Sequence, residues 1–180
     1  MSAKRLLHGD EDLFVNVLWK GLLWSALWMA YVYGIMKFFP WEMLHEYPEE
    51  IQRACTLKEP TLSQKRKSMI YNIVTSLFLF GLLMAFGLWQ FWGEPVAFWR
   101  VFLYLFGIAM TWNVVDLLVM DWLIVCTLRP SWVILPGTED CSSYGNLGHH
   151  FKGFLLGCLY MALLALLFAG IDVAILQMLT

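Results

Sequence analysis

Four long hydrophobic stretches leave this chain few ways to fold. They cover about residues 13–39, 69–92, 97–128 and 154–179. Each holds the roughly 20 mainly apolar residues that are needed to cross a hydrocarbon core about 30 Å thick. Hydrophobic residues make up 60% of the sequence and charged residues 14%, against about 45–50% and about 25% in soluble domains. We therefore expect an all-α integral membrane protein whose 180 residues form a single membrane domain.

Charge distribution predicts how the four spans are oriented. Four crossings place both termini on one side and the two long loops, residues 40–68 and 129–153, on the other. The loop side carries eight Lys and Arg residues, and the opposite side carries four. By the positive-inside rule the loops are cytoplasmic and both termini lie outside, although Lys4 and Arg5 oppose this orientation. A net charge of -2 gives no reason to expect a nucleic-acid partner.

Small residues spaced four apart predict close packing of the helices. Such spacing lets helix backbones approach each other in lipid. The residues concerned are Ala26, Ala30, Gly34, Gly81, Ala85, Gly153 and Gly157. A compact four-helix bundle, with a short cytoplasmic cap of helix and loop, is the expected product. The alternative use of these residues is an interface with a second copy or with a larger membrane complex.

The segment "WNVVDLLVMDWLIVCTLRP" puts carboxyl groups inside the third hydrophobic stretch. If this span leaves the hydrocarbon near residue 127, Asp121 lies roughly 9 Å deep and Asp116 roughly 16 Å deep. A charge at the centre of a membrane helix costs about 2.5 kcal/mol or more, so such residues usually face the protein interior and mark function. Asp172 and Lys20, near the outer ends of their spans, are placed to pair with each other.

In an α-helix each residue is turned about 100° from the one before it, so the two carboxyl groups should point in different directions. Asn113 and Asp116 share a face, whereas Asp121 points about 140° away from Asp116. Since the sequence offers no basic residue at matching depth, we expect Asp116 to carry a proton and to bond Ser25 or Ser76. Structural hydrogen bonding is one interpretation of this cluster. The alternative is a proton- or cation-coupled binding site that comprises Asn113, Asp116 and Asp121.

The two long loops contain a second group of polar residues. His45, Glu49, Glu139 and His150 are candidates for an acid-base site or for a divalent metal site, since imidazole and carboxylate groups suit zinc or a similar ion. A plainer interpretation is available for "HEYPEE", because proline followed by glutamates is typical of a helix start. That interpretation predicts a short amphipathic helix over about residues 48–57, lying along the membrane surface.

Basic residues beside these loops suggest contact with lipid. Arg129 and Lys152 are candidates for binding a phosphate or a lipid headgroup. His149 and His150 are adjacent, so they cannot point the same way from a helix, and we expect at most one of them to join a given site.

Several kinds of chemistry lack a sequence signal. The cysteines show no C-x-x-C spacing. The positions of the histidines do not fit a b-type haem held between helices. No Walker motif, nucleophile elbow or glycine-rich dinucleotide loop is present in the sequence.

The segments "HEYPEEIQ", "DLLVMDWLIVCTLRPSWVILPGTE" and "HFKGF" together resemble a group of uncharacterised bacterial integral-membrane proteins with four predicted spans. The resemblance covers the chain from about His45 to Gly157. Its motifs include Asp116, Asp121, Arg129, Pro136, Gly137, Thr138, Glu139, His150 and Lys152. It implies the architecture and no particular activity. We expect the bacterial inner membrane as the location.

Two functions are consistent with these features. The first is a small membrane protein that binds a lipid or a hydrophobic small molecule, as a transport or accessory subunit, with Asp116 and Asp121 in its cavity. The second is a membrane-embedded enzyme that acts on a lipid-like substrate at the cytoplasmic face. In that case the candidates His45, Glu49, Glu139 and His150 supply acid-base or divalent-metal chemistry.

Overall fold

Helices account for all the regular structure that the computed structural model describes, over residues 3–93 and 95–179. Four stretches are long and apolar enough to cross a membrane: Leu13–Phe38, Leu62–Gln90, Phe98–Leu128 and Leu147–Leu179. They belong to α1 (Ala3–Phe38), α4 (Leu62–Gln90), α5 (Phe98–Val115) continued by the π-helix η2 (Asp116–Leu128), and α6 (Leu147–Leu179). The predicted all-α, four-helix membrane class is confirmed.

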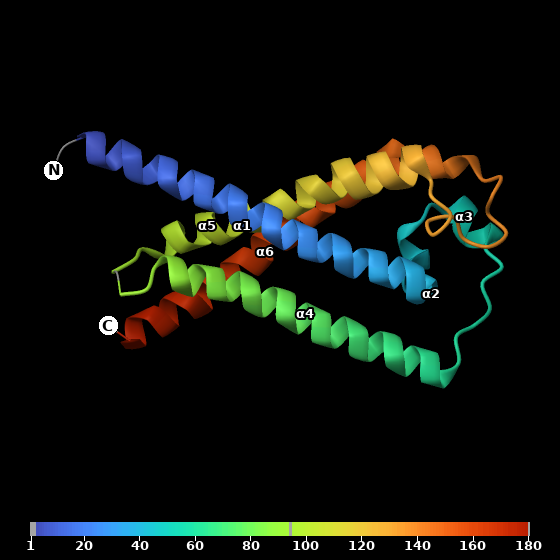
Figure 1. Ribbon diagram of the computed structural model, residues 1–180, viewed down its shortest axis with the longest axis horizontal. Coiled ribbons are helices and arrows are strands. Elements are labelled where there is room, and N and C mark those ends of the chain that lie inside the picture. Colours follow the sequence, from blue (N-terminus) through green and yellow to red (C-terminus); the bar gives the residue numbers. More distant parts are fainter. Residues whose placement is uncertain (1–2, 94, 180) are drawn as a thin grey trace.

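The long helices cross near the middle of the molecule, and the long loops gather at one end of it (Figure 1). That end, called the loop end below, carries residues 39–61 and 129–146, with the short elements α2 (Pro40–Met43), η1 (Leu44–Glu46), α3 (Glu49–Ala54) and η3 (Ser142–Gly145). The start of α1 and the end of α6 lie at the opposite end of the molecule, as does the turn between α4 and α5.

Three helices begin earlier than the hydrophobic pattern predicted, and the first of them, α1, begins at Ala3 rather than about residue 13. Helix α4 begins at Leu62 rather than residue 69, because Thr61 and Gln64 form a reciprocal capping box. Helix α6 begins at Leu147 rather than residue 154, and the Asn146 side chain accepts a hydrogen bond of 3.0 Å from the backbone N–H of His149. Hydropathy marks only the apolar part of a helix, whereas caps fix where it starts.

Helix α5 packs closely on α1 because glycines face larger side chains across the contact. A Cβ added at Gly21 would lie 2.7 Å from the Cβ of Thr111, and one added at Gly107 would lie 2.8 Å from Cγ1 of Val17. On the other side of α5, Gly157 of α6 contacts the Asn113 side chain. The glycines therefore set how near these helix axes can lie.

The spacing of small residues predicted only part of this packing. Gly34 meets Tyr71 between α1 and α4, and Gly157 meets Asn113, as expected for close contacts. Gly81 and Gly153 face open space instead. Ala26, Ala30 and Ala85 are exposed. Spacing alone does not say which face of a helix meets a neighbour, so Gly21 was missed.

The cap at the loop end is held by buried hydrogen bonds. The phenol of Tyr47 donates to the carbonyl of Val133 at 2.9 Å, and the backbone N–H of Leu135 donates to the Tyr144 hydroxyl at 2.9 Å. The Thr138 hydroxyl lies 2.7 Å from the same Tyr144 oxygen, and Thr138 is fully buried. The predicted cap of short helices and loops is therefore confirmed as a folded unit.

Helix α3 belongs to this cap. It begins directly after Pro48 and ends at Ala54, so it is shorter than the predicted helix over about residues 48–57. Ile51 is fully buried, and the Glu50 carboxylate accepts hydrogen bonds from the backbone N–H and the hydroxyl of Ser143. One face of the helix therefore packs on the second long loop.

Replacing Gly21 by leucine tests the packing of α1 on α5. The new side chain must push against the stiff, β-branched Thr111, so we expect destabilisation by about 1–3 kcal/mol or more. Thermal unfolding of the detergent-solubilised protein measures the effect. Gly81→Leu is the matched control, since that position is open. An unchanged melting temperature in Gly21→Leu would contradict the close contact.

Candidate functional site

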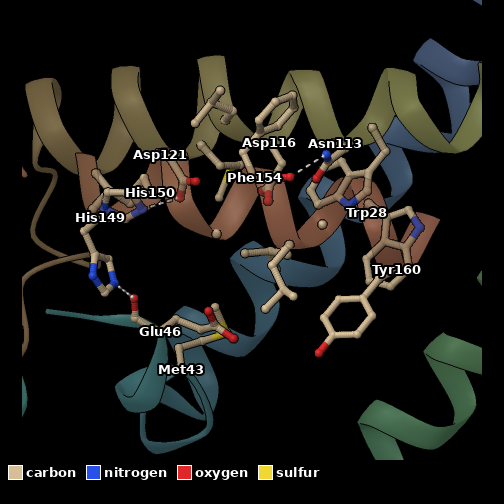
Figure 2. Close-up of a pocket in the computed structure, with 18 of the residues that line it drawn as sticks. Trp28, Met43, Glu46, Asn113, Asp116, Asp121, His149, His150, Phe154 and Tyr160 are labelled. Atoms are coloured by element: carbon tan, nitrogen blue, oxygen red, sulfur yellow. Dashed lines mark hydrogen bonds and ion pairs between the residues drawn. The ribbon is translucent and has the colours of Figure 1, made fainter. Parts of the chain in front are cut away.

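The π-helix η2 determines where the two membrane aspartates point. Its hydrogen bonds span five residues, as in the bond of 2.8 Å from the Arg129 N–H to the Ile124 carbonyl at its end. A π-helix winds more widely than an α-helix, so residues five apart point in more similar directions than they would in an α-helix. The prediction that Asp121 points about 140° away from Asp116 assumed α-helical winding and was wrong. Figure 2 shows both carboxyl groups on the same side of the helix.

These carboxyl groups line a cavity of about 420 Å³ near the loop end. Its walls come from α1, the α2–η1 segment, the α5–η2 helix and α6. The polar residues that line it are Glu46, Tyr47, Asn113, Asp116, Asp121, His149, His150 and Tyr160. Tryptophan, methionine and aliphatic side chains form the rest of the wall, and the volume lies within the range of about 300–1,000 Å³ typical of small-molecule sites.

A histidine holds one of the two carboxylates. Nδ1 of His150 lies 3.0 Å from Oδ1 of Asp121, and the side chains are 9% and 24% exposed. The early start of α6 makes this contact possible, because it places His150 in the first helical turns rather than in a loop. The pair therefore links η2 to α6 at the cavity wall.

The neighbouring histidine also lines the cavity. Nε2 of His149 lies 2.9 Å from the backbone oxygen of Glu46, and its ring is turned 87° from that of His150 (Figure 2). The two rings point in different directions, as predicted. The expectation that at most one of them would join a site was wrong, because residues from two elements meet at this cavity.

Tyr47 connects the cavity to the cap. Burial, and then the neighbouring Tyr144 and Asp121, raise the pKa of the Tyr47 phenol above its ordinary value. The hydroxyl therefore remains a neutral donor to the cap over the physiological range.

Asn113 and Asp116 play different roles despite sharing a wall. The Asn113 amide donates to the carbonyl of Phe154 at 3.1 Å and to Sγ of Cys158 at 3.4 Å, so it ties α5 to α6. Asp116 forms no hydrogen bond with another described residue. The expected bond from Ser25 is not formed, because that hydroxyl donates to the carbonyl of Gly21 on its own helix.

Two further polar atoms of the cavity residues lack partners. Within the described part of the chain, Nε2 of His150 and Nε1 of Trp28 are buried without a hydrogen bond. Trp28 stacks on Trp112 with ring centroids 5.6 Å apart, at the end of the cavity away from the histidines. Buried polar atoms are usually paired, so a ligand or water that completes them is a natural expectation.

The other loop candidates do not converge. His45 is exposed and lies 2.9 Å from Glu46, whereas Glu49 pairs with Arg53 at 2.6 Å on the surface of α3. Glu139 accepts a bond of 3.2 Å from its neighbour, the N–H of Gly137. Of the four candidates for acid-base or metal chemistry, only His150 lines the cavity. Over residues 3–93 and 95–179, no group of three His, Cys, Asp or Glu is arranged to hold a metal ion.

The two headgroup candidates lie outside the cavity. Arg129 and Lys152 are both exposed. Arg129 ends η2 in a left-handed conformation, with φ 45°, and its Nε donates to the carbonyl of Cys126 at 3.0 Å. Its observed contact is therefore with the end of the helix that carries the aspartates.

The predicted pairing of Asp172 with Lys20 does not form. Nζ of Lys20 donates to the Tyr104 hydroxyl at 2.7 Å, which in turn donates to Oδ1 of Asn16 at 2.8 Å. Asp172 is fully buried against Gly87 and has no hydrogen-bond partner among the described residues. These groups lie in the half of the bundle that contains the chain ends, away from the cavity.

Sequence reasoning did not bring Glu46 and His149 together with the aspartates, because both residues were assigned to loops. For Trp28 and Trp112, deep positions in the spans fitted a pocket and ordinary packing equally well. The common direction of Asp116 and Asp121 had no signal in the sequence, because a periodicity argument assumes the α-helical repeat.

The fold and the cavity together define a class: an all-helical bundle of the integral-membrane kind, with an acidic, aromatic-walled cavity under its loops. No protein-family model, curated protein or solved structure matches the chain.

Cysteine labelling tests whether Asp116 and Asp121 share a water-accessible wall. In a background without native cysteines, Asp116→Cys and Asp121→Cys should both react with a small, charged thiol reagent added from the loop end. Leu118→Cys should stay unmodified, because Leu118 is exposed on the outer, lipid-facing surface. Mass spectrometry of the labelled protein measures this. Reaction at only one of the two aspartate positions would indicate α-helical winding.

Proposed function

We propose that this protein binds a hydrophobic small molecule or a lipid in the cavity under its loops, as a carrier or as an accessory subunit of a membrane complex. The observation that supports this most is the composition of the wall. Hydrophobic residues of the spans meet acidic and histidine side chains inside one cavity of about 420 Å³. A largely apolar cavity with a few convergent polar groups is the usual form of a ligand site.

The order of the lining residues supports an elongated, amphipathic ligand. From the loop end inward, Figure 2 shows His150 and Asp121, then Asp116 and Asn113, then Trp28. The polar part of a ligand would face the carboxyl groups, and its apolar part would lie against the tryptophan stack. Methionine side chains in the wall adapt readily to different shapes.

Exposure of residues at the cavity rim supports entry from two directions. Glu46 at the loop end and Tyr160 on the outer side of α6 both line the cavity, and both are exposed. A molecule dissolved in the membrane would enter beside Tyr160, whereas a water-soluble one would enter past Glu46.

The proposed location is a bacterial inner membrane, with the long loops in the cytoplasm and both chain ends outside. Basic residues are more frequent on the loop side, which supports this orientation. The cavity would then belong to the cytoplasmic half of the protein.

A membrane-embedded enzyme is the second candidate, and the Asp121–His150 contact favours it. A carboxylate that accepts Nδ1–H of a histidine leaves Nε2 free to act as a general base. Nε2 of His150 has no partner in the described structure. Such a base would activate water for attack on a lipid-like ester, because no serine or threonine is among the described residues that line the cavity.

Hydrolysis of a chromogenic ester separates the enzyme from the binding protein. If the site is hydrolytic, the purified protein should release 4-nitrophenolate from micellar 4-nitrophenyl butyrate. Removing the base in His150→Gln should reduce the rate by about a hundredfold or more. His45→Gln is the control, since that histidine is exposed outside the cavity. Equal background rates in all three proteins would exclude this activity.

Filling the cavity tests the binding proposal directly. Gly153 lines the cavity and faces open space, so Gly153→Leu should occupy it without a clash. Gly170→Leu on the same helix is the matched control, since Gly170 also faces open space and does not line the cavity. In isothermal titration with 4-phenylbutanol, the parent and Gly170→Leu should bind, and Gly153→Leu should lose at least about tenfold in affinity. Identical binding by all three would contradict the proposal.

A further inference from the structure

The charge of the cavity wall points to the class of ligand. We propose that the cavity selects a hydrophobic primary amine in its protonated form. Its ammonium group would lie at Asp116 and Asp121, and its apolar body against Trp28 and Trp112. This inference rests on the proposed binding function and adds the chemistry of the ligand to it.

The first argument is the sign of the local charge. Three carboxyl groups line the cavity, those of Glu46, Asp116 and Asp121, and no Lys or Arg is among the described lining residues. The chain as a whole contains 12 Lys and Arg against 14 Asp and Glu, so the lack of basic residues is a local property. An anionic ligand would meet like charges here, whereas a cation would meet opposite ones.

The second argument concerns which groups of the wall still need a partner. Asp121 has one in His150, whereas Asp116 has no bond within the described structure. A carboxyl group at membrane depth normally faces a counter-ion or a hydrogen-bond donor. An ammonium group supplies both.

The third argument concerns the imidazole ring of His150. His150 is 8% exposed and lines the cavity, and its Nε2 lacks a partner in the described structure. When the ring donates Nδ1–H to Asp121, Nε2 is an acceptor and needs a donor. A primary ammonium group carries three N–H donors, which suits a wall whose unpaired polar groups near the aspartates are acceptors.

The remaining wall favours an organic cation over a metal ion. Trp28 and Trp112 stack with an interplanar angle of 21°, and four methionines line the same cavity. Hard cations require several oxygen ligands in place of their water, which thioethers and indoles do not provide. Indole faces instead attract organic ammonium groups and pack against apolar bodies.

Three ligands of equal shape test the inference: 4-phenylbutylammonium, 4-phenylbutanol and 4-phenylbutyrate. Isothermal titration of the full-length protein in detergent measures each dissociation constant at neutral pH, with Gly153→Leu as the filled-cavity reference. The ammonium compound should bind at least about tenfold more tightly than the alcohol, since hydrogen bonds to charged groups contribute about 1.5–3 kcal/mol. The carboxylate should bind most weakly.

Asp116→Asn should narrow the ratio of ammonium to alcohol affinity to below about threefold, because the side chain keeps its size but can no longer give up a proton and form an ion pair with the ammonium group. Asp140→Asn, an exposed loop position outside the cavity, should keep the ratio of the parent protein. An equal narrowing in both variants would overturn the assignment of the ammonium group to Asp116.

The outcomes separate the two proposals. If the alcohol binds, loses affinity in Gly153→Leu and equals the ammonium compound in the parent, the binding function stands and the selection of amines is overturned. If no compound binds the parent more tightly than Gly153→Leu, both proposals are overturned.

Discussion

The winding of the third membrane helix is the constraint on which the rest of the site depends. Continuing α5 as a π-helix from Asp116 onward brings two carboxyl groups onto one wall. The π-helix is a rare form and is frequently found at functional sites. The contact between Asp121 and His150 follows from it, because α-helical winding would turn Asp121 away from Asp116 and this wall.

The cap is the second requirement, and it explains the conspicuous loop sequences. Tyr47 reaches across to Val133, and Tyr144 and Thr138 form a buried hydroxyl pair beneath the second loop. These bonds fix the η1 segment, so that Glu46 can line the cavity and accept from His149. A distinctive segment such as "PGTE" is therefore accounted for by folding: Gly137 adopts φ 82°, and the threonine after it is buried. The rarity of a sequence pattern does not by itself indicate chemistry.

The fold was predictable from the sequence because burial in lipid depends on summed hydropathy, which four long segments display. The place of Asp116 and Asp121 in the wall of an interior cavity was also predictable, since a carboxyl group in an apolar span usually faces the protein interior. Their relative direction was not, because a periodicity argument assumes the α-helical repeat. The grouping of His45, Glu49 and Glu139 with His150 failed for a different reason. Each of these three residues has a partner close to it in the sequence: Glu46 for His45, Arg53 for Glu49, and the N–H of Gly137 for Glu139. A shared side of the membrane does not by itself bring residues from two loops together.

A layer of fully buried side chains, called the belt below, separates the cavity from the opposite end of the bundle. Whether a ligand can pass this layer distinguishes a carrier from a binding subunit. Asn113 and Gly157 mark the inner end of the α5–α6 contact, and Tyr104 and Asp172 lie beyond it. The positions between them that are fully buried are Leu105, Ile108, Ala109, Ala165 and Ala169. A carrier must let its ligand, or the ion coupled to it, pass this belt, whereas a binding subunit keeps it closed. Alanines form most of the α5–α6 part of the belt, and small side chains let packed helices slide with little loss of contact. On the far side of this belt lie the polar groups of Lys20, Tyr104 and Asp172.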